Sequence, residues 1–237
     1  PLPVNRNTLE DIFKVKLRNE KEALNFINNL RQKNLKPTNT DEFFLSKVGE
    51  KLTNIFFRPY TKKMWGIDPA ELELNVGARI PFRLNRDNRY FTDNFQCLPR
   101  DGYVSLFKNM LNHKNIKISL STKFEKSFEK DYSHCFLCLP IDSYFNYCFG
   151  ELPYRSIIFE DRVFINKTLD APTINFTDNS KYTRMTQWDL FSNSPINNSI
   201  NHTVTYEIPV DISSNPGEYY YPVKTIGSNK IYKKYEC

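Results

Sequence analysis

The chain has 237 residues, of which 40% are hydrophobic and 15% aromatic, so it is long enough to bury a substantial core in one or two globular domains. Its formal net charge is +6, but the basic residues are interleaved with acidic ones and form no block, which argues against a nucleic-acid-binding protein. No stretch is long and apolar enough to span a bilayer, and no signal-peptide pattern is present, so we expect a cytoplasmic protein without membrane contact.

The five cysteines also bear on function. Cys135 and Cys138 form the only CxxC pair, and no second pair accompanies it, so we expect no metal site. The pair lies in an apolar run over 134–140, which predicts a buried strand in which cysteine acts as a small apolar residue.

The first third of the chain predicts helices. The chain starts at Pro1 without an initiator Met, so we expect it to begin within a longer protein. Thr8 and Asp11 resemble the capping box of a first helix. A second helix is indicated by apolar residues at helical spacing, namely Ala23, Leu24, Ile27 and Leu30.

A third helix is expected over 41–57, because its apolar residues follow the helical period. Those residues are Phe44, Val48, Leu52, Ile55 and Phe56. Pro59 is expected to end this helix, and Asp68 before Pro69 predicts the N-cap of another short one.

The middle of the chain predicts one more helix over 102–111, followed by a strand in which Ile116, Ile118 and Leu120 alternate with polar residues. From about Tyr154 onward, short segments rich in β-branched and aromatic residues are separated by Asn, Ser, Asp and Pro, which predicts an antiparallel sheet. These segments cover 157–164, 173–176, 182–190 and 202–208. The predicted fold class is therefore α+β, with helices first and an antiparallel sheet last.

The most informative segment is Phe56 to Gly66, at the end of the third predicted helix. It holds four aromatic rings within ten residues, and composition alone favours their use in a hydrophobic core. Against that interpretation, Thr61, Lys62 and Lys63 interrupt the apolar pattern. Flat rings beside hydroxyl groups also suit a nucleobase, which is bound by stacking and a few edge hydrogen bonds.

This segment, written FFxxYTxKxWG, is the first of several motifs along the chain. The others are Asp68-Pro69 with Glu71-Leu72, Ala78 to Arg83, Asp87 to Phe91, Phe95 to Tyr103, Asn175, Tyr182 to Arg184, Tyr206-Glu207 and Tyr220 to Pro222. In order and spacing they closely resemble the UDP-galactopyranose mutases, over nearly the whole chain. Members of this family interconvert UDP-galactopyranose and UDP-galactofuranose with reduced FAD, so the resemblance implies an isomerase whose small-molecule partner is UDP-galactose.

The resemblance also implies site residues. The uridine pocket would be lined by Phe56, Phe57, Tyr60, Thr61, Trp65 and Asn175. Arg79 and Arg184 resemble the catalytic arginines that meet the pyrophosphate and the flavin face, with Arg79 also a cofactor contact. Tyr90, Tyr220 and Tyr221 resemble phosphate-contacting tyrosines, and Glu207 would orient a neighbouring side chain. If 220–221 lies in a regular strand, only one of its two tyrosines points inward.

FAD binding is where the chain departs from the family. None of its seven glycines forms the GxGxxG turn that places the FAD pyrophosphate at a helix N-terminus. The family's C-terminal flavin-contacting segment is missing, and Leu139 stands where family members usually have a glycine near FAD. We therefore expect a central fragment. Its parts are a helical substrate-binding domain over 1–75, a linker, helix and strands of a partial α/β FAD-binding domain over 76–150, and an antiparallel sheet domain over 151–237.

Three functions are open on these grounds. The chain is part of a working UDP-galactopyranose mutase and inactive by itself, or a truncated UDP-sugar-binding protein without catalysis, or part of a mutase for another UDP-hexose such as UDP-N-acetylgalactosamine. An upstream GxGxxG in the same reading frame separates the first two. The sequence leaves the physiological reductant and the oligomeric state open, with a homodimer as one candidate.

Overall fold

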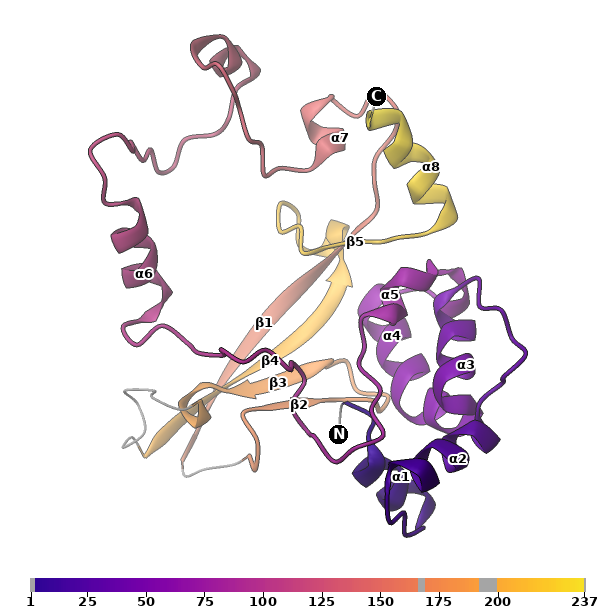
Figure 1. Cartoon of the computed structure of the whole chain (residues 1–237). Coiled ribbons are helices and arrows are strands. Elements are labelled where there is room, and N and C mark those ends of the chain that lie inside the picture. Colours follow the sequence, from indigo (N-terminus) through magenta and orange to yellow (C-terminus); the bar gives the residue numbers. More distant parts are fainter. Residues whose placement is uncertain (1–2, 166–168, 192–199, 237) are drawn as a thin grey trace.

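The computed structural model describes residues 3–165, 169–191 and 200–236 (Figure 1). Its first part is helical. This part comprises α1 (Arg6–Phe13), α2 (Glu20–Leu30), α3 (Thr40–Leu52), a π-helical turn (Thr53–Phe57), α4 (Arg58–Trp65), a 3-10 turn (Pro69–Glu71) and α5 (Leu74–Ala78). The predicted second helix and the predicted N-cap at Asp68 are both confirmed.

Asparagine side chains begin the first three helices. Asn5, Asn19 and Asn39 each accept a hydrogen bond from the backbone N–H three residues further on. In α1, Thr8 completes the capping box by accepting a hydrogen bond from the backbone N–H of Asn5. The predicted capping box of Thr8 with Asp11 is wrong, because the helix already starts at Arg6.

The predicted helix over 41–57 continues past Pro59 instead of ending there. After α3 the π-helical turn leads directly into α4. Pro59 lies in the first turn of α4, directly after the π-helical turn, so the expectation that it ends the helix is wrong. Gly49 marks a kink with φ of 77°, and an added Cβ there would lie 2.2 Å from the carbonyl oxygen of Leu30. Glycine therefore allows α3 to approach the end of α2 closely.

The apolar sides of these helices meet in one core. Its buried residues are Val4, Leu9, Leu17, Ala23, Ile27, Phe44, Val48, Leu52 and Phe57. Phe44 of α3 and Phe57 of the π-helical turn stack with ring centroids 4.4 Å apart. This stacking ties the start of α4 to α3.

Much of the segment between the helices and the sheet extends away from both (Figure 1). It contains α6 (Gly102–Leu111), a 3-10 turn (Lys126–Asp131) and α7 (Ile141–Tyr144). The helix over 102–111 is confirmed, although none of its residues is buried. The strands predicted near 116–120 and 134–140 are wrong, because no described strand lies beside either to form a ladder. Cys135 and Cys138 are accordingly exposed, and Cys237 lies outside the described residues.

The antiparallel sheet is confirmed, and with it the α+β fold class. Its strands are β1 (Tyr154–Ile165), β2 (Thr173–Asn175), β3 (Arg184–Gln187), β4 (Asn201–Asp211) and β5 (Tyr221–Pro222), in the spatial order β2-β3-β4-β1-β5. The strand predicted over 182–190 is shorter than expected, because the chain turns into a 3-10 helix (Trp188–Leu190) after Gln187. A 3-10 turn (Ile212–Ser214) and the helix α8 (Ile226–Tyr235) have no counterpart in the sequence prediction.

A second core joins α4 to the sheet. Its buried residues are Met64, Trp65, Leu72, Val76, Ile157 and Val223, with Tyr60, Ile67 and Tyr221 packed against them. Because α4 lies against β4, it can present side chains to this strand and to its neighbour β3. The candidate site lies at this contact.

Candidate functional site

Three neighbouring strands bring three polar side chains into one row. The pairing sets Asn175 of β2 opposite Arg184 of β3, and Arg184 opposite Glu207 of β4. Residues directly opposite each other point to the same face of a sheet, so the three side chains meet. Nε of Arg184 donates to Oδ1 of Asn175 at 3.1 Å, and Nη1 of Arg184 lies 3.5 Å from Oε1 of Glu207.

Helix α4 places Tyr60 beside this row. Burial raises the pKa of the Tyr60 phenol, and the neighbouring Arg184 guanidinium offsets part of that rise. Burial alone would lower the pKa of Arg184, but nearby Tyr60, Glu207 and Tyr221 outweigh it, so the pKa of Arg184 is raised. Tyr60 is therefore a neutral hydroxyl and Arg184 a cation at physiological pH. Together they suit an anionic ligand such as a phosphate.

Trp65 and Tyr221 form an aromatic border to the row. Their rings meet edge to face with centroids 5.8 Å apart, and Trp65 is 7% exposed. Tyr220 is 41% exposed, and its hydroxyl donates to Glu218 at 3.1 Å while its ring packs on Phe159. Of the two adjacent tyrosines, Tyr221 is thus the one that lies beside Trp65 and near Arg184.

Two of the predicted pocket residues serve the helical core. Phe57 is 2% exposed and stacks on Phe44, and Phe56 packs partly buried against the same core. Thr61 is also buried. The core interpretation therefore holds for Phe57, and Tyr60 and Trp65 are the rings of this segment that lie beside the sheet.

Arg79 and Tyr90 do not contact the row. Arg79 is exposed at the end of α5, and it makes no hydrogen bond or ion pair within the part of the chain that the structure describes. Tyr90 is 42% exposed, and its ring packs edge to face on Phe91. Both belong to the segment 79–90, which is held against the helical part: the N–H of Arg6 donates to the carbonyl of Asn85 at 3.0 Å, and the side-chain amide of Asn5 donates to the carbonyl of Asp87 at 3.0 Å.

Two links that the sequence analysis does not single out hold α4 against the sheet. Nζ of Lys63, whose pKa is lowered by burial, donates to the backbone carbonyl of Tyr182 at 2.6 Å and lies 3.5 Å from Asp178. Nε of Arg155 donates to the backbone carbonyl of Met64 at 3.2 Å. The partners are 119 and 91 residues apart in sequence, so no local pattern could have identified these links.

The described residues provide neither a metal-ion cluster nor the main FAD-binding element. Among the described residues, no group of three or more His, Cys, Asp or Glu side chains could hold a metal ion, and no helix is long and apolar enough to cross a membrane. FAD needs a parallel βαβ unit whose glycine-rich turn binds the pyrophosphate. All strand pairs of the described sheet are antiparallel, so these residues do not provide the main FAD-binding element.

Comparison with known proteins identifies the family. A family model described as UDP-galactopyranose mutase matches residues 55–237, which include the whole row and α4. The chain belongs to the UDP-galactopyranose mutase family. The resemblance inferred from the sequence motifs is thereby confirmed.

Relatives of this mutase-family chain support the same assignment. Over 99% of its length it is 34% identical to the dTDP-fucopyranose mutase of Escherichia coli and 31% identical to the probable UDP-galactopyranose mutase of Klebsiella pneumoniae. It covers 64% and 60% of these two proteins. A crystal structure of reduced UDP-galactopyranose mutase shares its fold, with a TM-score of 0.62 at 17% identity over 90% of this chain and 62% of that one. The chain therefore spans less than two thirds of each of these proteins.

Proposed function

We propose that this chain provides the nucleotide-sugar site of a mutase, an isomerase that interconverts the pyranose and furanose forms of a sugar bound to a nucleoside diphosphate. UDP-galactose is the first substrate to test, because the matched family carries that substrate in its name. The observation that carries the proposal is the row of Asn175, Arg184 and Glu207 beside Tyr60. It combines a cation, a hydroxyl and an amide, which are the groups that bind a nucleoside diphosphate.

Arg184 is the proposed contact to the pyrophosphate. As the nucleotide leaves the sugar, negative charge grows on the bridging oxygen, so a guanidinium there stabilises the transition state more than the bound substrate. Asn175 and Glu207 hold this guanidinium from two sides and fix its direction before the substrate arrives. Glu207 is thus the orienting residue of the row.

The nucleoside is proposed to lie along α4. Tyr60 and Trp65 present rings on the side of the helix that faces the sheet, and Tyr221 extends this surface. Oδ1 of Asn175 accepts from Arg184, and its amide group can still donate to a pyrimidine carbonyl. Phe56 from the π-helical turn and Thr61 from α4 would complete this pocket. Phe57 would support it from the core.

FAD is proposed as the cofactor, held mainly by parts of the protein outside this chain. In its reduced form it supplies the nucleophile for the sugar's anomeric carbon. Arg79 is the proposed contact to it from this chain, since its exposed guanidinium has no partner among the described residues.

The division into domains stays a proposal as well. We assign 1–75 to substrate binding, 76–150 to a linker and part of the FAD-binding domain, and 151–237 to the sheet domain. The exposed apolar residues of α6 support the middle assignment, because such a surface is normally covered by protein. The cytoplasmic location and the homodimer likewise remain predictions.

The nucleotide base is the main open choice. The relative from E. coli is a dTDP-fucopyranose mutase, and it is 34% identical to this chain. A thymidine-diphosphate sugar is therefore the second candidate substrate, ahead of UDP-N-acetylgalactosamine, which no relative named above suggests. A protein that only binds UDP-sugars is the remaining alternative.

The test uses the product of the complete reading frame, chemically reduced and incubated with UDP-galactose or dTDP-fucose. Chromatography then measures pyranose–furanose conversion. We expect conversion that Arg184→Ala slows about a hundredfold. Arg162→Ala is the matched control, because Arg162 lies in the same sheet with similar exposure but packs on Tyr206. Binding without conversion of either sugar would leave only the non-catalytic alternative, and absence of both would refute the proposed site.

A further inference from the structure

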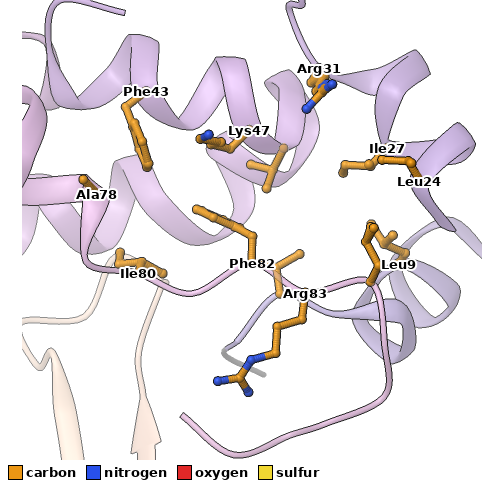
Figure 2. Close-up of a pocket in the computed structure, with 13 residues that line it drawn as sticks. Leu9, Leu24, Ile27, Arg31, Phe43, Lys47, Ala78, Ile80, Phe82 and Arg83 are labelled. Atoms are coloured by element: carbon orange, nitrogen blue, oxygen red, sulfur yellow. The ribbon is translucent and has the colours of Figure 1, made fainter. Parts of the chain in front are cut away.

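A cavity lies in the helical part of the molecule, apart from the row (Figure 2). Its volume is about 480 Å³, within the range of small-molecule sites. Helices α1, α2 and α3 form one side of it, and the extended segment 78–84 forms the other. The row residues Asn175, Arg184 and Glu207 take no part in its lining.

The lining of the cavity is mostly apolar. Its apolar residues are Val4, Leu9, Leu24, Ile27, Phe43, Val48, Ala78, Ile80, Phe82 and Leu84. The segment 78–84 is held in place by the backbone, since the N–H of Arg83 donates to the carbonyl of Val4 at 2.9 Å and Val4 pairs with Phe82. The cavity is therefore preformed.

The charged residues around the cavity are all cations. Arg31, Lys47 and Arg83 line it, and no acidic residue does. In Figure 2 the guanidinium of Arg83 points away from the cavity, and it donates to backbone carbonyls, including that of Tyr90 at 2.9 Å. Arg31 and Lys47 lie on the helical side of the cavity (Figure 2). These two are the cations available to an occupant.

Neither available cation is neutralised by the protein. Nε of Arg31 is buried without a hydrogen-bond partner, and a buried donor left unpaired is costly. Nζ of Lys47 lies 5.4 Å from the centre of the Phe43 ring, and neither residue forms an ion pair within the described part of the chain. The Arg31 guanidinium can pair with an anionic group, and the Lys47 ammonium adds positive charge to the same lining.

We propose that this cavity binds a small amphipathic anion, namely a monocarboxylate with a flexible apolar body. Its carboxylate lies against Arg31, with Lys47 adding positive charge to the lining, and its apolar body lies between Ile27 and Phe82. The charge of the two cations selects an anion, and burial of apolar surface supplies most of the binding free energy. Nucleotide-sugar binding at the row does not depend on this site.

The test is calorimetric titration of the purified product of the complete reading frame with decanoate. Decanol serves as a neutral probe of similar shape. We expect one saturable decanoate site and about tenfold weaker decanol binding, the effect of losing one charge-assisted hydrogen bond. The double variant Arg31→Gln/Lys47→Gln is expected to lose decanoate affinity to a similar degree. Lys51→Gln is the matched control, since Lys51 is on the same helix but packs on Phe13 outside the cavity.

A further variant localises the binding. Leu24→Trp enlarges a lining side chain that is 39% exposed, so it is expected to occupy the cavity without disturbing the core, which thermal unfolding checks. Decanoate binding should then disappear. Binding that persists in folded Leu24→Trp would place decanoate elsewhere, such as on α6, and would overturn the proposal. Equal affinity for decanol, or no saturable site at all, would overturn it as well.

Discussion

Arg184 contacts one side chain from each neighbouring strand, and its own side chain is 37% exposed. A side chain that is held by its neighbours and is still partly exposed can contact a ligand. Replacing it therefore tests whether it serves the fold or the reaction. Replacing an arginine that only lies on the surface changes the free energy of unfolding by under about 0.5 kcal/mol. A guanidinium aimed at developing charge is worth far more to the reaction rate.

Arg184→Ala is expected to lower turnover about a hundredfold, equivalent to about 3 kcal/mol, while UDP binding weakens much less. Arg184→Lys is expected to recover little, because an ammonium cannot reproduce the two-pronged contact of a guanidinium. Steady-state kinetics of the chemically reduced product of the complete reading frame measures both. Near-normal turnover of Arg184→Ala would remove this residue from the mechanism.

Trp65 provides an optical probe of the same site. UDP is expected to quench tryptophan fluorescence, because Trp65 borders the row, whereas Trp188 lies in a separate 3-10 turn and is 52% exposed. For the 237-residue polypeptide, whose pocket would lack its flavin side, we expect UDP to bind no more tightly than in the roughly micromolar range. Trp65→Phe should abolish most of the quench and Trp188→Phe should retain it. The opposite pattern would place the nucleotide elsewhere.

At the scale of elements, the π-helical turn and the kink at Gly49 set the direction of α4. The turn carries Phe57 back onto α3, and Arg58 then pairs with Asp41 at 2.6 Å, which ties the start of α4 to the start of α3. With its N-terminal end fixed in this way, α4 presents Tyr60 and Trp65 to the sheet. The geometry of the site thus depends on residues that never touch it.

Gly49→Ala is expected to destabilise the fold by about 3 kcal/mol, because the new Cβ would collide with the Leu30 carbonyl in addition to the strain of a positive φ. Gly217→Ala is the matched control: its φ is +91° and nothing lies within 4 Å of an added Cβ, so only the conformational strain applies. Chemical denaturation measures both variants. Equal losses of stability would show that the close approach to α2 contributes nothing.

At the scale of the whole molecule, the activity of the chain depends on which elements of a mutase its described residues carry. The described sheet is antiparallel, and α6 buries none of its residues. Both facts agree with the proposal that parts of the protein outside the described residues would cover α6 and hold FAD.

The 237-residue polypeptide purified alone is therefore expected to be colourless and unable to convert UDP-galactose, because the described residues lack a cradle for the FAD pyrophosphate. An absorbance spectrum and a conversion assay check this. The product of the complete reading frame is the control and should be yellow. Stoichiometric flavin in the 237-residue polypeptide would contradict the prediction.

Sequence patterns predict the elements whose cause is local. The apolar spacing of α2 and the β-branched residues of β1 and β4 give correct helices and strands. Near 116–120 and 134–140 the same reasoning fails, since a strand exists only if a partner lies beside it. The row has the same dependence, because the pairing of Asn175, Arg184 and Glu207 is a property of sheet register. Their grouping could be anticipated only from the family resemblance, whereas the links made by Lys63 and Arg155 could not be anticipated at all.

The acceptors of those two links have a consequence for how substitutions act. Both Lys63 and Arg155 donate to backbone carbonyls, those of Tyr182 and Met64, and every amino acid carries that group. Changing the donor residue removes the link, whereas changing the side chain at the acceptor position leaves it in place. A mutational scan should therefore record these contacts at one position of each pair only. Methods that detect contacts through paired substitutions would miss both, although they join the helices to the sheet.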